Sequence, residues 1–351
     1  MCCLALDFRI GMFMNNRNVV RLIIAVLILV FFTILVDQLL VPVSATSVNS
    51  SIYLDSQSGG DDAPQPFTQE DLILLSGNVL RPNGMFWHDG YLYIGCNGDF
   101  TIYRVDDTTG ATITYIAGVE NVNELYVEGE TDATQLWVPD YSRDTFTNID
   151  RARGANARAD VAEGLAAPWG IEAIEDDFLI TMFRTDELVR MTRTGETEVI
   201  ATGFRSPTGV VIDDTTVFVA NHESARRSIE WFNLDDIGDE PLQDTDMQQL
   251  VKGLQFTTNL VIGPDGMLYF AYALGQRGVV GRVDPVECME AGGCSNIDVE
   301  PVVWTELQAP LVGLNITPDM RLYIHSQYGA EIYWLQLPDD SVVRASEEDD
   351  S

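Results

Sequence analysis

The chain has 351 residues, of which 46% are hydrophobic, so it can bury a sizeable core and does not belong to the intrinsically disordered class. It carries 54 acidic residues against 20 basic ones, a formal net charge of -34 at pH 7. This charge argues against nucleic acid and anionic membrane surfaces as partners, because both would repel it. Two interpretations of the acidic composition remain. It either provides a solvated surface that keeps the protein soluble, or recruits cations and adapts the protein to high salt.

The first element along the chain is an apolar segment. Residues 22–36 are apolar without a break, and apolar character resumes over residues 39–43. Three arginines precede the segment, so the positive-inside bias predicts that residues 1–21 stay in the cytosol and that everything after the segment is extracytoplasmic. Residues 22–45 are then one hydrophobic helix. It is either an uncleaved signal anchor or a signal peptide, cleaved near Ala45 after the small residues Val43-Ser44-Ala45.

Two further segments flank the predicted domain. Residues 46–68 are rich in Ser, Asp, Gly, Gln and Pro, a composition typical of a flexible linker. Residues 338–351 end in Glu-Glu-Asp-Asp-Ser and are expected to be an acidic, disordered tail. The folded domain is therefore expected to span residues 69–337.

A β-rich pattern repeats through this domain. Residues 81–95, RPNGMFWHDGYLYIG, predict two strands, Gly84 to Trp87 and Tyr91 to Gly95, joined by a tight turn. Related sequences begin further along the chain, at Val122, Ala167, Ser206, Thr257 and Leu311. Self-similarity at a spacing of roughly 40 to 50 residues is typical of propeller arrays. Six copies predict six blades.

The two ends of the repeat region differ from the rest. The unit that starts at Leu311 supplies only three strands, whereas the strand DLILLSG, from Asp71, has no partner before it. A ring of blades must be closed, and a spare first strand can complete the last blade. We therefore predict an all-β, six-bladed β-propeller in which Leu72 to Leu75 pair with Glu331 to Leu337.

Five cysteines are too few for a disulfide scaffold. Cys96 ends a predicted strand and is expected to be buried. Cys288 and Cys294 bracket MEAGG, a short flexible loop that would close as a local disulfide in an oxidising compartment.

Propeller topology decides which polar residues converge. Each inner strand starts at one rim of the central channel, and the loop between the second and third strands returns to that rim, which we call the channel mouth. The starts of the inner strands bring Asn83, Asn123, Glu124 and Asn259 to the mouth. The loops bring other polar groups there, among them His222 and His325.

The repeats resemble those of six-bladed propellers of the NHL and gluconolactonase/paraoxonase/strictosidine-synthase-like group. Pro82-Asn83-Gly84 is similar to an Asn-Gly signature of that group. Asn123-Glu124 resembles an Asn–acid pair, and Asn259 resembles a further Asn position. In the metal-dependent members a calcium-type ion lies at the channel mouth, so the resemblance implies Ca2+ held by these four residues.

Amide and carboxylate oxygens suit a hard cation such as calcium. The sequence departs from the group's pattern, however, because Glu124 is the only carboxylate among the four. The alternative is that Asn83, Asn123 and Asn259 satisfy backbone groups at the starts of strands.

The histidines are candidates for proton transfer. His222 is flanked by Asn221 and Glu223 at the mouth, where it would serve as a general base or acid. Paired with His325, it would suit lactone opening, or a lyase step like that of the streptogramin lyases, whose propeller repeats look similar. The alternative is that His222 is a solvent-facing residue of a polar loop. The sequence has no nucleophile elbow, zincin motif, phosphate loop or dinucleotide fingerprint.

Two functions follow from these observations. The first is an extracytoplasmic, metal-dependent lactonase or esterase in which the ion polarises the ester carbonyl and His222 moves protons. The second is a non-enzymatic binding module whose mouth recognises a small molecule, a glycan or a partner protein. In either case we expect a monomer that contacts the membrane only through its N-terminal segment.

Overall fold

The fold is described from a computed structural model of the chain, in which residues 65–338 are described. The predicted cytosolic segment, the anchor or signal helix and nearly all of the linker and acidic tail lie outside these residues. Within residues 65–338 there is no helix long and apolar enough to cross a membrane.

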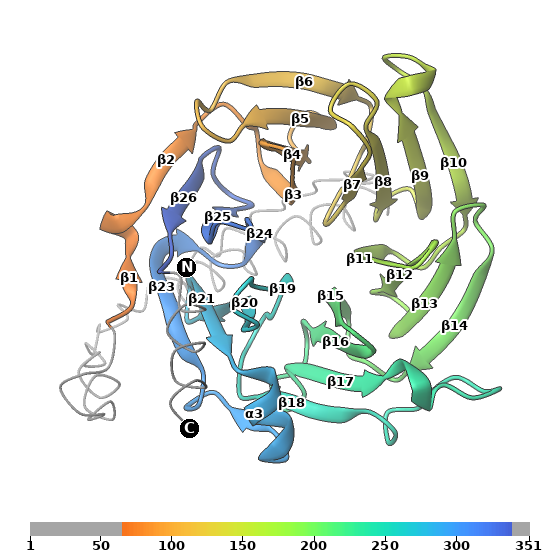
Figure 1. Cartoon of the computed structure of the whole chain (residues 1–351), viewed down its shortest axis with the longest axis vertical. Coiled ribbons are helices and arrows are strands. Elements are labelled where there is room, and N and C mark those ends of the chain that lie inside the picture. Colours follow the sequence, from red (N-terminus) through yellow and green to blue (C-terminus); the bar gives the residue numbers. More distant parts are fainter. Residues whose placement is uncertain (1–64, 339–351) are drawn as a thin grey trace, which may run out of the picture. The chain divides into compact units, whose positions relative to one another are not determined.

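Six sheets of four principal strands are arranged around one axis, as predicted (Figure 1). In blades 1 to 3 the chain runs from the innermost to the outermost strand. These strands are β3 (Pro82–His88), β4 (Tyr91–Cys96), β5 (Thr101–Asp106) and β6 (Thr112–Ala117), then β7 (Tyr126–Glu128), β8 (Gln135–Asp140), β9 (Thr145–Asp150) and β10 (Arg158–Glu163), then β11 (Pro168–Ile174), β12 (Asp177–Met182), β13 (Glu187–Thr192) and β14 (Thr197–Thr202).

Blades 4 and 5 follow the same plan, each with a short fifth strand at its outer edge, whereas blade 6 takes its outermost strand from the N-terminal end of the described residues. Their strands are β15 (Pro207–Asp213), β16 (Thr216–Asn221), β17 (Ile229–Asn233), β18 (Gln248–Lys252) and β22 (Cys294–Ser295), then β19 (Leu260–Ile262), β20 (Leu268–Leu274), β21 (Arg277–Val283), β23 (Glu300–Gln308) and β1 (Phe67–Thr68), then β24 (Leu311–Ile316), β25 (Arg321–Ser326), β26 (Ile332–Gln336) and β2 (Ile73–Ser76).

Local turn chemistry explains the repeated hairpins. Between β3 and β4, Asp89 and Gly90 both have positive φ angles, of 49° and 80°. Two consecutive left-handed residues match the right-handed twist of the flanking strands, and Asp-Gly tolerates this conformation well. The predicted strand pair is therefore confirmed.

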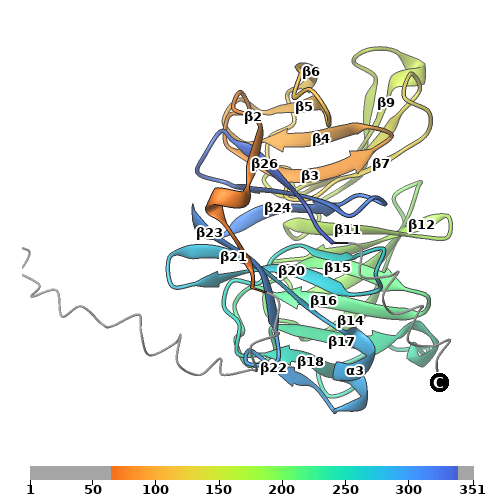
Figure 2. The ribbon, with the colours of Figure 1, turned by 60° about the vertical axis from the view of Figure 1, so that its left-hand side comes forward.

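The predicted ring closure is also confirmed. Strand β2 pairs antiparallel with β26, with Ile73 opposite Trp334 and Leu74 opposite Tyr333 (Figures 1 and 2). As predicted, β2 has no strand partner before it in the sequence, because it pairs only with β26. The sequence did not predict the preceding strand β1, which pairs in parallel with β23 of blade 5. A strand of two residues is too short to give a periodic signal.

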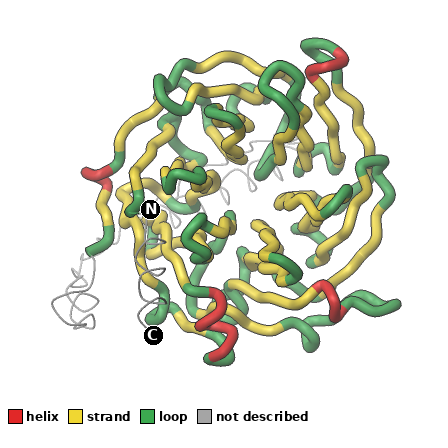
Figure 3. The backbone as a smooth tube through the Cα atoms, viewed as in Figure 1, coloured by secondary structure: helices red, strands yellow, loops and turns green. Residues whose placement is uncertain are grey.

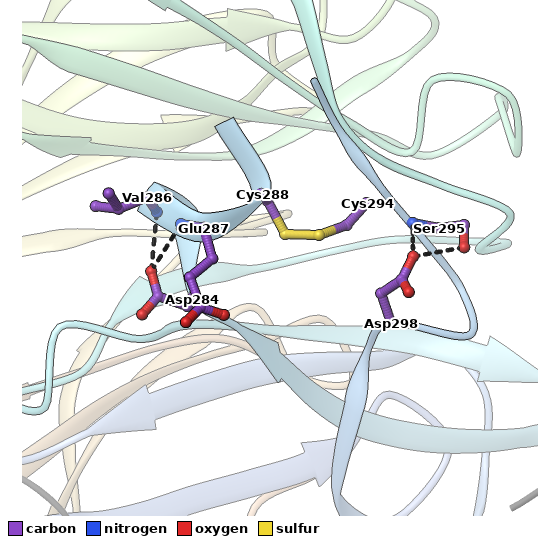
Figure 4. Close-up of a disulfide and its surroundings, with 7 residues drawn as sticks. All are labelled: Asp284, Val286, Glu287, Cys288, Cys294, Ser295 and Asp298. Carbon is purple, nitrogen blue, oxygen red and sulfur yellow. Dashed lines mark hydrogen bonds between the residues drawn. A yellow bond between two sulfur atoms is a disulfide. The ribbon is translucent and has the colours of Figure 1, made fainter. Parts of the chain in front are cut away.

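Helical turns lie at the outer edge of the ring (Figure 3). They are the 3-10 turns η1 (Gln69–Asp71), η2 (Arg151–Arg153) and η3 (Leu234–Asp236) and the α-helix α3 (Pro285–Glu290). Helix α3 extends into the flexible loop predicted between Cys288 and Cys294, ending at Glu290. Asp284 accepts hydrogen bonds from the backbone nitrogens of Val286 and Glu287, and Pro285 opens the first turn (Figure 4).

The disulfide left open by the sequence is present between Cys288 and Cys294 (Figure 4). It joins α3 to β22, which in turn pairs in parallel with β18 of blade 4. Cys96 is a free, buried cysteine, as expected.

The apolar core is divided among the gaps between blades. Six clusters of buried side chains occur within the described residues, one for each pair of neighbouring blades. Tyr93 and Ile102 of blade 1, for example, pack with Leu136 of blade 2. Each blade is thus buried on both faces, which explains why its strands alternate so little between apolar and polar residues.

Candidate functional site

The third residue of the inner strand is glycine in four blades, and these glycines are Gly84, Gly170, Gly209 and Gly313. A Cβ added at Gly84 would lie 2.8 Å from backbone atoms of Asn123 and Glu124, and one at Gly209 would lie 2.9 Å from the Cα of Asn259. No side chain fits at such contacts, so glycine is required here for close approach. We call this position the glycine level.

Blades 2 and 5 carry Glu124 and Asn259 at the glycine level. In blade 2, Val122 pairs with Asp140 as Pro82 pairs with Cys96 in blade 1. Glu124 therefore occupies the position that Gly84 occupies in blade 1. The Nδ2 of Asn259 donates a hydrogen bond to Oε1 of Glu124, at 3.0 Å. Since blades 2 and 5 are opposite each other in a ring of six, this contact, which we call the axial bridge, spans the channel.

Glu124 is held mainly in its protonated form. Its side chain lines a cavity and is therefore partly exposed to solvent, although protein covers most of its surface. Burial raises its pKa to about 8, against the opposing effect of hydrogen bonds from the Ile171 nitrogen, at 3.2 Å, and from Asn259. Burial also raises the pKa of Glu172, on β11, to about 8. Sequence reasoning missed Glu172, although an acidic residue inside the apolar run GIEAI was a signal.

The other two predicted ligands belong to a separate amide network. The Nδ2 of Asn83 donates to the side-chain oxygens of Asn121, at 3.1 Å, and Asn123, at 2.5 Å. The Nδ2 of Asn97 donates to the same oxygen of Asn121, at 2.8 Å. Asn83 and Asn123 are therefore brought together as predicted, but as hydrogen-bonded amides.

The four predicted calcium ligands thus form two pairs, and no hydrogen bond in the described part of the chain joins one pair to the other. Asn123 accepts from Asn83, and both oxygens of Glu124 already accept hydrogen bonds. Among the side-chain oxygens of these four residues, only Oδ1 of Asn259 is buried without a hydrogen-bond partner. Residues 65–338 also contain no group of three or more His, Cys, Asp or Glu side chains placed to hold a metal ion. As arranged, these donors do not fit a single hard cation, which takes six to eight oxygen ligands.

His222 lies among aromatic rings at the channel mouth. Its ring centre is 5.1 Å from that of Phe256 and 6.2 Å from those of Trp169 and Phe183. Trp169 stacks on Phe183 at 5.1 Å, and Tyr141 meets Trp169 edge-on at 5.6 Å. We call these five residues the aromatic cluster. Of these five residues the sequence analysis named only His222, and it did not predict the cluster.

The chemistry of His222 follows from this environment. Burial lowers the pKa of its imidazole, while Glu223 and the backbone of Thr257 act in the opposite direction. Its Nδ1 is buried without a hydrogen-bond partner. The imidazole is therefore neutral at pH 7, and one of its ring nitrogens makes no hydrogen bond within the described residues.

His325 lies in a different environment. Its side chain is fully buried at the end of β25, next to Gly313, and burial lowers its pKa to about 3. Neither ring nitrogen has a hydrogen-bond partner. No hydrogen bond or ring contact within residues 65–338 connects His325 with His222, so the structure does not bring the predicted pair together.

The fold and the mouth define a six-bladed β-propeller with an aromatic, histidine-containing surface at one end of its channel. No protein-family model and no curated protein matches the chain. A gluconolactonase structure from Xanthomonas campestris aligns over 76% of this chain and 89% of its own, with a TM-score of 0.58 and 15% identity. A streptogramin B lyase structure aligns over 75% of this chain and 96% of its own, with a TM-score of 0.51 and 13% identity.

A third similar structure is virginiamycin B lyase from Staphylococcus aureus, a catalytically inactive histidine-to-alanine variant with quinupristin. It aligns over 78% of this chain and 98% of its own, with a TM-score of 0.51 and 14% identity. At these identities the likeness concerns the fold. The resemblance expected from the repeats is confirmed at that level.

Proposed function

We propose that the propeller is a hydrolase or lyase that opens a lactone or another cyclic ester at the channel mouth, with His222 as the group that moves the proton. The observation that carries this proposal is the neutral, half-buried imidazole of His222, with its unpartnered Nδ1, inside the aromatic cluster. A base with a pKa near or below neutrality is suited to proton transfer at pH 7. The similar gluconolactonase and lyase structures suggest the substrate class.

Two reactions fit such a base. In hydrolysis, His222 takes a proton from water as the water oxygen bonds to the ester carbonyl carbon, and returns it to the alkoxide when the ring C–O bond breaks. In elimination, it takes a proton from the carbon adjacent to the one that bears the ester oxygen. A C=C bond then forms, and the C–O bond breaks to release a carboxylate. The aromatic cluster would hold the ring of the substrate by stacking.

The test compares two histidines on opposite faces of the ring. The full chain is assayed against a panel of lactones and cyclic esters in H218O, where label enters the product of hydrolysis but not that of elimination. We expect His222→Ala to lower kcat by about a hundredfold or more. His88→Ala, at the β3–β4 turn, should leave kcat unchanged. A parent-like rate in His222→Ala would refute the assignment.

Calcium is a separate question, and no step of this mechanism depends on it. The prediction of Ca2+ at Asn83, Asn123, Glu124 and Asn259 is tested by melting the parent and Glu124→Gln with chelator and with CaCl2. Because the donors form two pairs, we expect chelation to leave the melting temperature of both proteins unchanged. A calcium-dependent rise that Glu124→Gln removes would instead support the predicted site.

A non-enzymatic binding module is the second candidate. This candidate is favoured because no side chain within residues 65–338 forms a hydrogen bond that would orient the His222 ring. Asn221 bonds instead to the Arg205 nitrogen and to Glu230, and Glu223 is exposed. On this alternative, a small molecule, glycan or protein binds at the mouth without turnover. Trp169→Ala should then weaken binding equally when introduced into the parent and into the His222→Ala variant.

We also propose that the propeller is extracytoplasmic, tethered by residues 22–45 or released after cleavage. The Cys288–Cys294 disulfide supports this location, because disulfides persist in oxidising compartments. A reporter fused after Leu337 should be active outside the cytosol, and activity confined to the cytosol would contradict the proposal. Mass spectrometry that finds Thr46 at the mature N-terminus would identify the secreted form.

A further inference from the structure

A cavity of about 310 Å3 lies along the axis on the side of the glycine level away from the mouth. Its wall begins at Glu124 and Asn259 and continues to Ile212 and Ile262, toward the far ends of β15 and β19. None of the aromatic cluster lines it. The axial bridge thus separates this cavity from the mouth, and its volume is at the lower end of the range of small-molecule pockets, about 300 to 1,000 Å3.

Eleven of the fifteen residues that line the cavity are apolar, and the four polar ones are Glu124, Glu172, Asn259 and Asn315. Asn259 is only 5% exposed, and its Oδ1 has no hydrogen-bond partner. The side chain of Glu172, which is partly exposed, makes no hydrogen bond or ion pair within the described residues. A buried amide oxygen without a partner is costly unless a ligand supplies a donor, and the carboxyl group of Glu172 is open to the same ligand.

We propose that this cavity binds a small organic ammonium ion. Its alkyl part would lie against the apolar side chains of the wall, and its nitrogen would donate to Glu172 and to Oδ1 of Asn259, beside Glu124. A primary ammonium group has three N–H donors, which matches the two oxygens of the Glu172 carboxylate and the one of Asn259. The ring of Phe86, which also lines the cavity, adds a surface that attracts cations.

The polar side chains of the wall distinguish this ligand from a metal ion. A hard divalent cation needs six or more oxygen ligands, whereas both oxygens of Glu124 already accept hydrogen bonds, and Glu172, Asn259 and Asn315 together offer at most four more.

The test measures binding of hexylammonium to the full chain by calorimetry, with 1-hexanol as the uncharged analogue. We expect hexylammonium to bind and hexanol to bind at least about tenfold more weakly, because a charge-assisted hydrogen bond is lost. Glu172→Gln should raise the Kd for hexylammonium about tenfold. The matched variant Glu163→Gln, at an exposed position of β10, should leave it unchanged.

Three outcomes would overturn the proposal. The first is that hexylammonium does not bind, and the second is that hexanol binds with equal affinity. The third is that Glu172→Gln binds hexylammonium as tightly as the parent while melting no lower than the parent. Displacement of hexylammonium by CaCl2 at matched ionic strength, lost in Glu172→Gln, would assign the cavity to a metal ion instead. His222→Ala should not alter hexylammonium binding, so the result is independent of the function proposed for the mouth.

Discussion

Burying a carboxyl group beside the channel axis makes the stability of the fold depend on pH. The pKa of Glu172 is raised from 4.5 to about 8 by burial. Below pH 4.5 the group is protonated in both the folded and the unfolded state and has no effect. Between 4.5 and 8 the unfolded state loses the proton while the folded state keeps it, so the free energy of unfolding falls as pH rises, and the loss is complete above pH 8.

Glu172→Gln should therefore stabilise the protein at pH 8 by on the order of 1 to 3 kcal/mol, and change little at pH 4.5. Urea unfolding of parent and variant at pH 4.5, 6 and 8 checks this, with Glu163→Gln as the control. A gain of the same size at all three pH values would point to packing rather than to ionisation.

At the residue scale the sequence predicted which residues reach the mouth better than it predicted how they combine. Consecutive residues of an extended chain point to opposite sides, so Asn123 bonds to Asn83 of the neighbouring blade while Glu124 turns to the axis and meets Asn259. That last contact joins residues 135 positions apart and depends on the ring geometry. The repeats alone do not specify it.

Among the elements, β2 decides whether the ring is closed. It covers the outer edge of β26, with Ile73 opposite Trp334. Deleting residues 69–76 should leave that edge unpaired, lower the melting temperature and promote aggregation, because exposed edges pair with other chains. Thermal melting and light scattering check this, with truncation after Asp340 as the control. A deletion variant that melts like the parent would contradict a role in closure.

The disulfide is the second element-scale device, since it fastens α3 to β22 beside blade 4. It closes a loop with a sequence separation of 6, and loop entropy predicts a contribution of about 2 kcal/mol to the free energy of unfolding. Cys288→Ser/Cys294→Ser should lose that amount in urea unfolding. Reducing agent should destabilise the parent and leave the double variant unaffected. Equal stability of the two proteins under oxidising conditions would refute the estimate.

The elements that repeat were predictable and the single ones were not. The turn at Asp89-Gly90 has counterparts in the other blades, and each copy reinforces the same prediction. Strand β1 and helix α3 each occur once. Helix α3 depends on the N-cap at Asp284 and on the Cys288–Cys294 disulfide. In a short acidic segment, both are weak sequence signals for a helix.

For the whole molecule, the formal charge of -34 predicts that salt stabilises the fold. Raising NaCl from 0.1 to 1 M shortens the Debye length from about 10 to about 3 Å and screens the repulsion among acidic groups. We expect the melting temperature to rise over this range, and KCl to act as NaCl does. A rise with one salt but not the other would indicate specific ion binding.

The closing strand also ties the fold to the direction of protein synthesis. The ribosome makes β1 and β2 before every other strand of the ring, yet their partners β23 and β26 belong to the two blades made last. Folding of the complete ring must then wait for translation to finish, while β1 and β2 remain unpaired. A chain truncated anywhere before β26 would form an open arc of blades rather than a smaller closed propeller, so only the complete chain can close the ring.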